Sequence, residues 1–169
     1  MNIEIRKAKV GDEIGVAKLF NEGLKRKNFI YIGRNTFVTK SRIAKWRKAY
    51  SEKKPEGYFF VAIGDGKLIG HVNFDFKRKG RGRHIADFGW IMHPDYQGKG
   101  IATNLLKFAL DFAEKKGFKK AEAEISVPNT ASLKLAKKLG FKIEGRKKIS
   151  MILDNGKYVD TFIVGKVLK

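Results

Sequence analysis

The chain has 169 residues, of which 43% are hydrophobic, and this length and composition suit one folded domain, residues 1–169. Its formal net charge of +20 favours anionic partners. The absence of Cys excludes a disulfide framework and a thiolate nucleophile, and three scattered His do not make a zinc site. The charges in Met1–Arg6 argue against a signal peptide there. No apolar run reaches the ~20 residues that a membrane helix needs. We therefore expect a cytoplasmic protein without a membrane partner.

The first half of the chain predicts a strand, two helices and three further strands. A short strand pattern begins at Ile3 and extends as far as Val10, and an amphipathic helix opens at Gly11. Thr39–Glu52 is expected to be the second helix. The pattern then changes to period two. Strands are expected over 58–63, 68–76 and 84–92, with a hairpin turn at 64–67 and a basic loop at 77–83.

The second half predicts two helices and three strands. Gly98–Lys116 is the longest helical pattern, and a strand follows over 121–127. A short helix begins after its cap, Asn129, and ends at Gly140. The last two strands, 141–153 and 157–168, form a hairpin with its turn at 154–156. The order β-α-α-β-β-β-α-β-α-β-β predicts a mixed sheet flanked by helices.

A Gly-rich turn joins the strand that ends near Met92 to the longest helix. Gly98 and Gly100 lack Cβ, so that backbone N–H groups can approach an anion, and the helix N-terminus and Lys99 add positive charge. This pattern predicts a pyrophosphate site, with a tight turn that binds no ligand as the alternative. The nucleotide P-loop pattern is broken here, and Thr103 stands where the dinucleotide fingerprint needs its third Gly.

Two motifs resemble one family. Gln97, Gly100 and Ala102 match the signature Gln/Arg-x-x-Gly-x-Gly/Ala of the GNAT superfamily of N-acetyltransferases, and residues 129–141 resemble its later motif, Asn-x-x-Ala/Ser followed by Gly-Phe. The resemblance covers residues 3–168 and is greatest to phosphinothricin-type and RimJ/RimL-type members. It implies an α/β (α+β) fold with a mixed, mostly antiparallel sheet of about seven strands flanked by about four helices.

The resemblance also implies a reaction and a site. An amine would attack the thioester of acetyl-CoA directly in a ternary complex, with a backbone N–H near Met92 polarising the carbonyl. Asp87, six residues before His93, matches the position of a Glu in phosphinothricin-type members and is the candidate base; an ion-paired surface Asp is the alternative. The implied cofactor-binding residues are Trp90, Ile91, Met92, Gln97, Gly98, Lys99, Gly100, Ile101, Ala102, Thr103, Asn129 and Ser132.

The sequence departs from the family at Ala136, where many members place a Tyr that protonates the departing thiolate. A reference thiol pKa of about 8.5 lets the thiolate leave without much help. Ser132 would hold a water there, or serve in capping or packing. The remaining acceptor-cleft candidates, each with core packing or a structural role as the alternative, are Tyr31, Phe37, Trp46 and His71.

The identity of the acceptor stays open between a protein N-terminus and a small amine. A free polyamine is disfavoured by the net charge unless the cleft is locally acidic. The loop Lys77–Arg83, with five basic residues in seven, indicates an anionic partner (ribosome, RNA or an acidic protein) or a solvated loop. The rival function is a ribosome- or RNA-associated module that keeps the fold with weak or no catalysis, and a homodimer is also open.

Overall fold

One seven-stranded sheet runs through the protein, in the order β1-β2-β3-β4-β5-β7-β6, with a parallel pair only at β4–β5. The computed structural model describes residues 2–25, 37–53, 55–153 and 155–169. The predicted element order and fold class are confirmed. The elements are β1 Ile3–Lys7, α1 Asp12–Lys25, α2 Lys40–Ser51, β2 Gly57–Gly64, β3 Lys67–Asp75, β4 Ile85–Met92, α3 Ile101–Lys115, β5 Lys120–Ser126, α4 Thr130–Lys138, β6 Lys142–Ile152 and β7 Tyr158–Val167.

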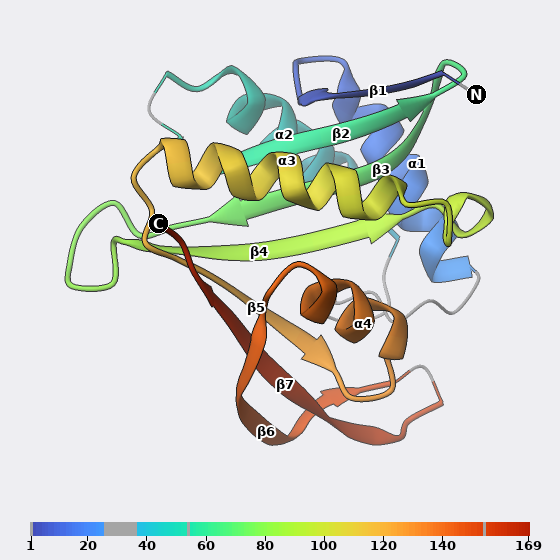
Figure 1. Ribbon diagram of the computed structural model, residues 1–169. Helices are drawn as coiled ribbons and strands as arrows, with labels where there is room; N and C mark the ends of the chain where they lie inside the picture. Colours follow the sequence, from blue (N-terminus) through green and yellow to red (C-terminus); the bar gives the residue numbers. More distant parts are fainter. Residues whose placement is uncertain (1, 26–36, 54, 154) are drawn as a thin grey trace.

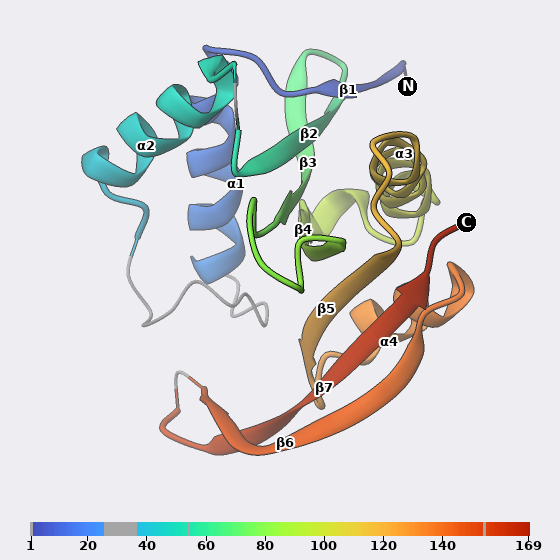
Figure 2. The same cartoon turned by 90° about the vertical axis from the view of Figure 1, so that its left-hand side faces the viewer.

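The helices cover the sheet in two layers (Figure 1). Helices α1 and α2 lie on one face of strands β1–β4, and α3 lies on the other. After β4 the sheet bends away, so that β5, β6 and β7 form a second arm that carries α4, as Figure 2 shows from the side. The two arms meet along β4 and β5.

The main core lies between α3 and the sheet. Its helix side is the apolar stripe of α3, including Leu105, Leu106 and Ala109, and its sheet side includes Phe60 and Phe74. Each large apolar side chain buried in this way stabilises the fold by about 1.5–3 kcal/mol. α3 is thus an amphipathic surface helix, and in the part of the chain that the structure describes no helix is long and apolar enough to cross a membrane.

Two expected boundaries differ from the observed ones. Strand β1 ends at Lys7 rather than Val10, because the chain turns there towards Gly11, which has a φ of +106°. Helix α3 begins at Ile101 rather than Gly98, because Gly98 and Gly100 both have positive φ, a conformation that cannot continue a right-handed helix. The remaining predicted elements agree within one or two residues, and position 154 of the last turn lies outside the described residues.

An ion pair between a buried carboxylate and a half-exposed guanidinium joins α1 to α2. The Glu13 side chain is fully buried, and its carboxylate accepts hydrogen bonds from Arg47 Nε at 2.7 Å and from the Gly11 N–H at 2.7 Å. Burial by itself would raise the pKa of Glu13, but these hydrogen bonds outweigh it and hold the pKa below its ordinary value. The stabilisation is therefore present above the ordinary pKa of Glu and is lost as the pH falls through the lowered value.

Replacing Arg47 by Leu should lower the free energy of unfolding at neutral pH by about 1–3 kcal/mol, because a buried carboxylate loses its charged partner. Lys48→Leu, at an exposed neighbouring position of α2, is the matched control. Urea denaturation measures both variants. Equal stability of the two would show that the ion pair contributes nothing.

Candidate functional site

The site begins where β4 and β5 separate. The two strands pair only at Ile85, Ala86 and Asp87, the last opposite Glu122. Beyond that point the rest of β4 and the rest of β5 have no ladder between them. Backbone groups along this gap are therefore available to a ligand that lies in it.

The direction of the backbone in β4 follows from its pairing with β3. The His93 N–H donates to the Ile69 carbonyl at 2.7 Å, and Met92 lies opposite Gly70. Successive residues of an antiparallel ladder turn their backbone groups to opposite sides. The N–H groups of Met92 and Trp90 therefore point away from β3, into the gap.

Gln97, the first residue of the signature, fixes the end of this strand. Its Nε2 donates to the Met92 carbonyl at 3.5 Å. The carbonyl of Met92 thus has a partner, and the Met92 N–H remains as a donor to a ligand.

A cavity of about 490 Å³ extends from the gap to the turn before α3, within the range of small-molecule sites. Its walls come from the end of β4, from the signature turn and from the first turns of α4. They comprise Trp90, Ile91, Met92, Tyr96, Gln97, Gly98, Gly100, Ala102, Thr103, Pro128, Asn129, Thr130, Ala131, Ser132, Lys134, Leu135 and Lys138.

The signature turn forms an open cradle at one end of this cavity. Gly98 and Gly100 have φ of +74° and +76°, and nothing lies within 4 Å of the position that a Cβ would take at either residue. Gly100 is the N-cap of α3 and offers no side-chain cap, so the first N–H groups of the helix have no partner within it. An open backbone surface at a helix N-terminus suits a pyrophosphate.

Helix α4 forms the floor of the cavity and is hydrogen-bonded to β4. The Asn129 Oδ1 caps the helix by accepting from the Ser132 N–H at 3.1 Å, and the Ser132 Oγ accepts from the Trp90 indole Nε1 at 3.2 Å. The capping prediction for Asn129 is confirmed. The hydrogen bond from Trp90 to Ser132 spans the gap and links the two arms of the sheet.

Ten of the twelve predicted cofactor-binding residues line the cavity. The two exceptions are Ile101 and Lys99. Ile101 is buried in the core, so that only its backbone faces the turn. Lys99 lies outside the cavity lining, with its Nζ 5.3 Å from the centroid of the Tyr96 ring. The sequence analysis missed Lys134 and Lys138, whose ammonium groups suit phosphate. Helical spacing could have identified both lysines. One face of the helix carries the residues at i, i+3, i+4 and i+7, which are Ala131, Lys134, Leu135 and Lys138.

A second cavity, of about 140 Å³, lies at the same gap on the face that carries α1. Trp90, Asn129 and Ser132 line both cavities and form the boundary between them. The other walls come from α1, β3, β4, β5 and β6. They comprise Phe20, Asn73, Phe88, Gly89, Ala123, Glu124, Ile125, Ser126 and Met151.

Asp87 lies beside this second cavity rather than in its lining. It is on the same face of β4 as Gly89, which does line the cavity, and two residues before it. Partial burial, then the nearby carboxylates of Asp75, Glu122 and Glu124, raise the pKa of Asp87, although its side chain still reaches solvent. No ion pair to Asp87 is present in the part of the chain that the structure describes.

The other candidates have mostly structural surroundings. Ala136 is fully buried in the core, and Phe37 is exposed. Trp46 packs against Phe20 at 5.5 Å between ring centroids. His71 is buried beneath Phe20, and burial lowers its pKa to about 4, so that it is neutral. Tyr31 lies outside the described residues.

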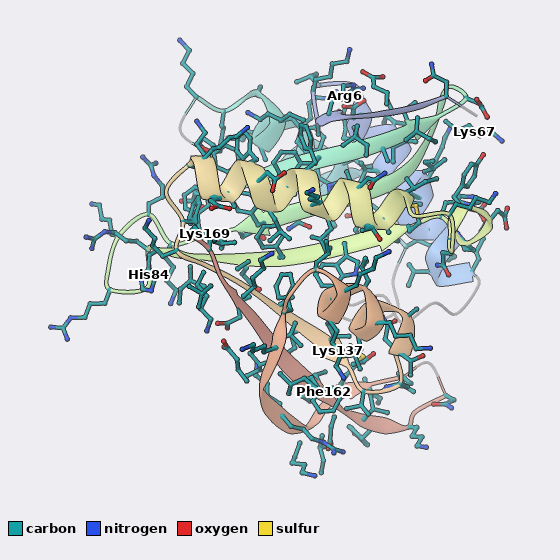
Figure 3. All side chains as sticks on the ribbon, in the orientation of Figure 1. Arg6, Lys67, His84, Lys137, Phe162 and Lys169 are labelled. Carbon is teal, nitrogen blue, oxygen red and sulfur yellow. The ribbon has the colours of Figure 1, made fainter. Side chains whose placement is uncertain are left out.

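The basic loop 77–83 connects β3 to β4 at the end of β4 opposite the cradle, near His84 in Figure 3. It does not contribute to either cavity. Figure 3 also shows the side chains of Arg6, Lys67, Lys137 and Lys169 on the outside of the molecule. Among the described residues, no cluster of three or more His, Asp or Glu is placed to hold a metal ion.

The chain is similar to acetyltransferases of known sequence and structure. The model of the acetyltransferase (GNAT) family matches residues 26–141. L-amino acid N-acetyltransferase AaaT of Escherichia coli (strain K12) is 32% identical over 108 residues, which are 63% of this chain and 66%, just under two thirds, of that protein. L-amino acid N-acyltransferase MnaT of the same organism is 32% identical over 141 residues, 82% of this chain and 79% of that protein.

A solved structure shows the same fold. The phosphinothricin acetyltransferase (Pat) from Sinorhizobium meliloti, in complex with AcCoA, has a TM-score of 0.85 and 22% identity, covering 99% of this chain and 89% of that one. The chain belongs to the acetyltransferase (GNAT) family, whose acetyltransferases use acetyl-CoA, and the predicted resemblance is confirmed. The open cradle, the lysines of α4 and the donors along the gap fit that cosubstrate.

Replacing Gly100 by Ala should weaken CoA binding roughly tenfold or more, because a Cβ enters the open cradle and disturbs the N–H groups at the helix N-terminus. Gly117→Ala is the matched control. Gly117 lies just beyond the other end of α3, with a φ of +86° and the same open space. Both variants should lose roughly 1–2 kcal/mol of stability, but calorimetry should show weaker CoA binding only for Gly100→Ala. Equal affinity of the two variants would show that the cradle is misplaced.

Proposed function

We propose that the chain transfers the acetyl group of acetyl-CoA directly to a primary amine in a ternary complex, within one catalytic domain. Acetyl-CoA occupies the larger cavity, and the amine occupies the smaller one on the other face of the gap. One observation carries the proposal, namely that the two cavities share Trp90, Asn129 and Ser132 and so meet at a single boundary. The thioester carbonyl lies at this boundary.

In the reaction, the lone pair of the amine nitrogen attacks the carbonyl carbon of the thioester. The C–N bond forms, and the C–S bond then breaks to release the CoA thiolate. The Met92 N–H donates a hydrogen bond to the oxyanion that develops between these events, a contribution of about 2.7–4 kcal/mol when such a donor is preorganised. No cysteinyl intermediate is involved, since the chain has no Cys.

Asp87 is the proposed base for the ammonium form of the amine. Asp87 lies two residues from Gly89 on the same strand face, which corresponds to roughly 7 Å at 3.3–3.4 Å per residue. A water therefore carries the proton from an amine in the cavity to the Asp87 carboxylate. Burial and the neighbouring carboxylates raise the pKa of Asp87, which makes its carboxylate a stronger proton acceptor than an ordinary Asp. The surrounding negative charge also attracts the ammonium group.

The thiolate departs without a general acid from α4. Ala136 occupies the position in question and is fully buried, so no side chain there reaches the sulfur. A thiol pKa of about 8.5 makes the thiolate a tolerable leaving group. The ammonium form of the amine loses two protons in all: Asp87 takes the first before the attack, and the nitrogen loses the second after the C–N bond has formed. One of these protons reaches the thiolate through solvent and the other is released to solvent, which balances the reaction.

The size of the smaller cavity favours a small amine over a protein N-terminus. Its volume of about 140 Å³ is close to that of an apolar cavity of about 150 Å³ that binds benzene. Only the amine and a few neighbouring atoms of an acceptor therefore enter the enclosed part. The names of the two relatives, both of which act on L-amino acids, agree with a small acceptor.

The proposal is tested by thermal denaturation with and without acetyl-CoA, together with release of free thiol in the presence of a panel of amines and N-terminal peptides. A ligand at about 100 times its Kd adds about 2.7 kcal/mol of stability. A raised Tm with thiol release for an amine is the expected result. An unchanged Tm at saturating acetyl-CoA would refute the proposal.

Replacing Asp87 by Asn should lower kcat/KM for the amine roughly 10²-fold while leaving CoA affinity unchanged, because the base is lost but the cradle is intact. In the native enzyme kcat/KM should rise as the pH passes upward through the raised pKa of Asp87, and this limb should be absent in the Asn variant. Asp87→Glu should keep much of the rate. Full activity of the Asn variant in a thiol-release assay would remove Asp87 from the mechanism.

A further inference from the structure

Four carboxylates gather beside the smaller cavity of a strongly basic protein. Asp75 on β3 lies opposite Asp87 on β4, which lies opposite Glu122 on β5, and Glu124 follows on the same face of β5. Directly opposite residues in a sheet have Cβ atoms roughly 4.5–5.5 Å apart, close enough for like charges to destabilise each other. This arrangement contrasts with the net charge of +20.

Two of the four carboxylates have cationic partners and two do not. Glu122 lies 3.0 Å from Lys120 Nζ, and Glu124 lies 2.6 Å from Lys147 Nζ and also accepts from the Thr161 hydroxyl. In the described residues, neither Asp75 nor Asp87 has a cation within ion-pair distance.

The one hydrogen bond to the Asp75 side chain comes from Asn73 Nδ2 at 3.3 Å, again within the described part of the chain. Partial burial raises the pKa of both Asp75 and Asp87, and for Asp87 the nearby charge of Lys147 offsets only part of the rise. A cationic ligand would supply the missing partner.

The cavity itself contains an unsatisfied polar group. Ser126 is 3% exposed and lines the cavity, and its Oγ has no hydrogen-bond partner among the residues that the structure describes. Such a buried group costs about 1–3 kcal/mol unless a ligand supplies the partner. An amine nitrogen in the cavity would donate to this Oγ.

The cavity and the carboxylates lie in line along the sheet. Asn73, Gly89 and Glu124 line the cavity. Each is two residues along its strand, on the same face, from Asp75, Asp87 and Glu122 respectively, which corresponds to roughly 7 Å. A ligand of a few carbon atoms would therefore reach from one to the other.

The charges around the cavity select against a negatively charged acceptor, and in this respect the chain is expected to differ from the two relatives that act on L-amino acids. No Lys or Arg of the described chain lines it, whereas Glu124 does. An acceptor carboxylate would therefore lie beside Glu124 and near Asp87 and Asp75. The nearby cations Lys120 and Lys147 are already engaged with Glu122 and Glu124.

We propose that the preferred acceptor is a small amine that carries a second positive charge a few carbon atoms from its reacting nitrogen. The reacting amine lies in the smaller cavity against Ser126 and Glu124, and the second cation pairs with Asp75, with Asp87 between the two. This inference rests on the proposed function and deepens it. A basic enzyme is expected to accept a polyamine only if its cleft is locally acidic. The carboxylates beside the smaller cavity supply that acidity.

Three probes of equal chain length test the proposal: putrescine, n-butylamine and γ-aminobutyrate, which differ mainly in the charge of the far end. Binding to the CoA-loaded protein is measured by calorimetry, and kcat/KM with acetyl-CoA by thiol release. Putrescine should bind roughly tenfold or more tightly than n-butylamine, and γ-aminobutyrate should bind most weakly. The kcat/KM values should follow the same order.

Asp75→Asn should reduce the preference for putrescine over n-butylamine roughly tenfold. Asp111→Asn, the same change at an exposed position of α3 on the other face of the sheet, is the matched control and should leave the preference unchanged. Asp75 is itself exposed, so its replacement does not threaten the fold.

Different results would contradict the dicationic acceptor and the proposed acetyl transfer. Equal turnover of all three amines, a preference for γ-aminobutyrate, or an unchanged preference in Asp75→Asn would overturn the dicationic acceptor while the acetyltransferase function stands. Asp75-dependent binding of putrescine without thiol release would support the cation site and overturn the proposed transfer.

Discussion

The parallel ladder between β4 and β5 ends at Asp87 and Glu122, and the site depends on that ending. In a continuous sheet the backbone groups of Trp90, Met92 and the end of β5 would pair with each other. Because the strands separate, these groups face a gap that α4 closes with the hydrogen bond from Trp90 to Ser132. The same separation creates a cavity on each face, so the strands position both the proposed donor site and the proposed acceptor site.

The chemistry assigned to the side chains is correspondingly modest. In the proposed reaction a backbone N–H stabilises the oxyanion, and a helix N-terminus, open glycines and the lysines of α4 bind the cosubstrate phosphates. These groups are oriented by secondary structure and need no reorganisation during the reaction. With Ala136 in the core and no Cys in the chain, a base beside the acceptor and a good leaving group are the remaining requirements.

The distribution of charge separates the two cavities. Lys134 and Lys138 lie on the α4 wall of the larger cavity, whereas Glu124 lies on the smaller one with Asp75 and Asp87 beside it. The net charge of the chain therefore describes its outer surface and not its cleft. This distribution suits an anionic cosubstrate on one face of the gap and the proposed cationic acceptor on the other.

The sequence by itself determined the elements, their order, the family and most of the predicted residues that line the larger cavity. These features depend on local patterns, such as the glycines of the signature turn, the Asn129 cap and the helical spacing that also contained Lys134 and Lys138. Only the tertiary structure decided the acceptor side, because Asn73, Gly89, Glu124 and Ser126 come from three strands and share no sequence pattern. The register of β3, β4 and β5 places Asp75 opposite Asp87 and Asp87 opposite Glu122. Such pairing is set by long-range packing, which also buries Ser126 without a hydrogen-bond partner in the described part of the chain.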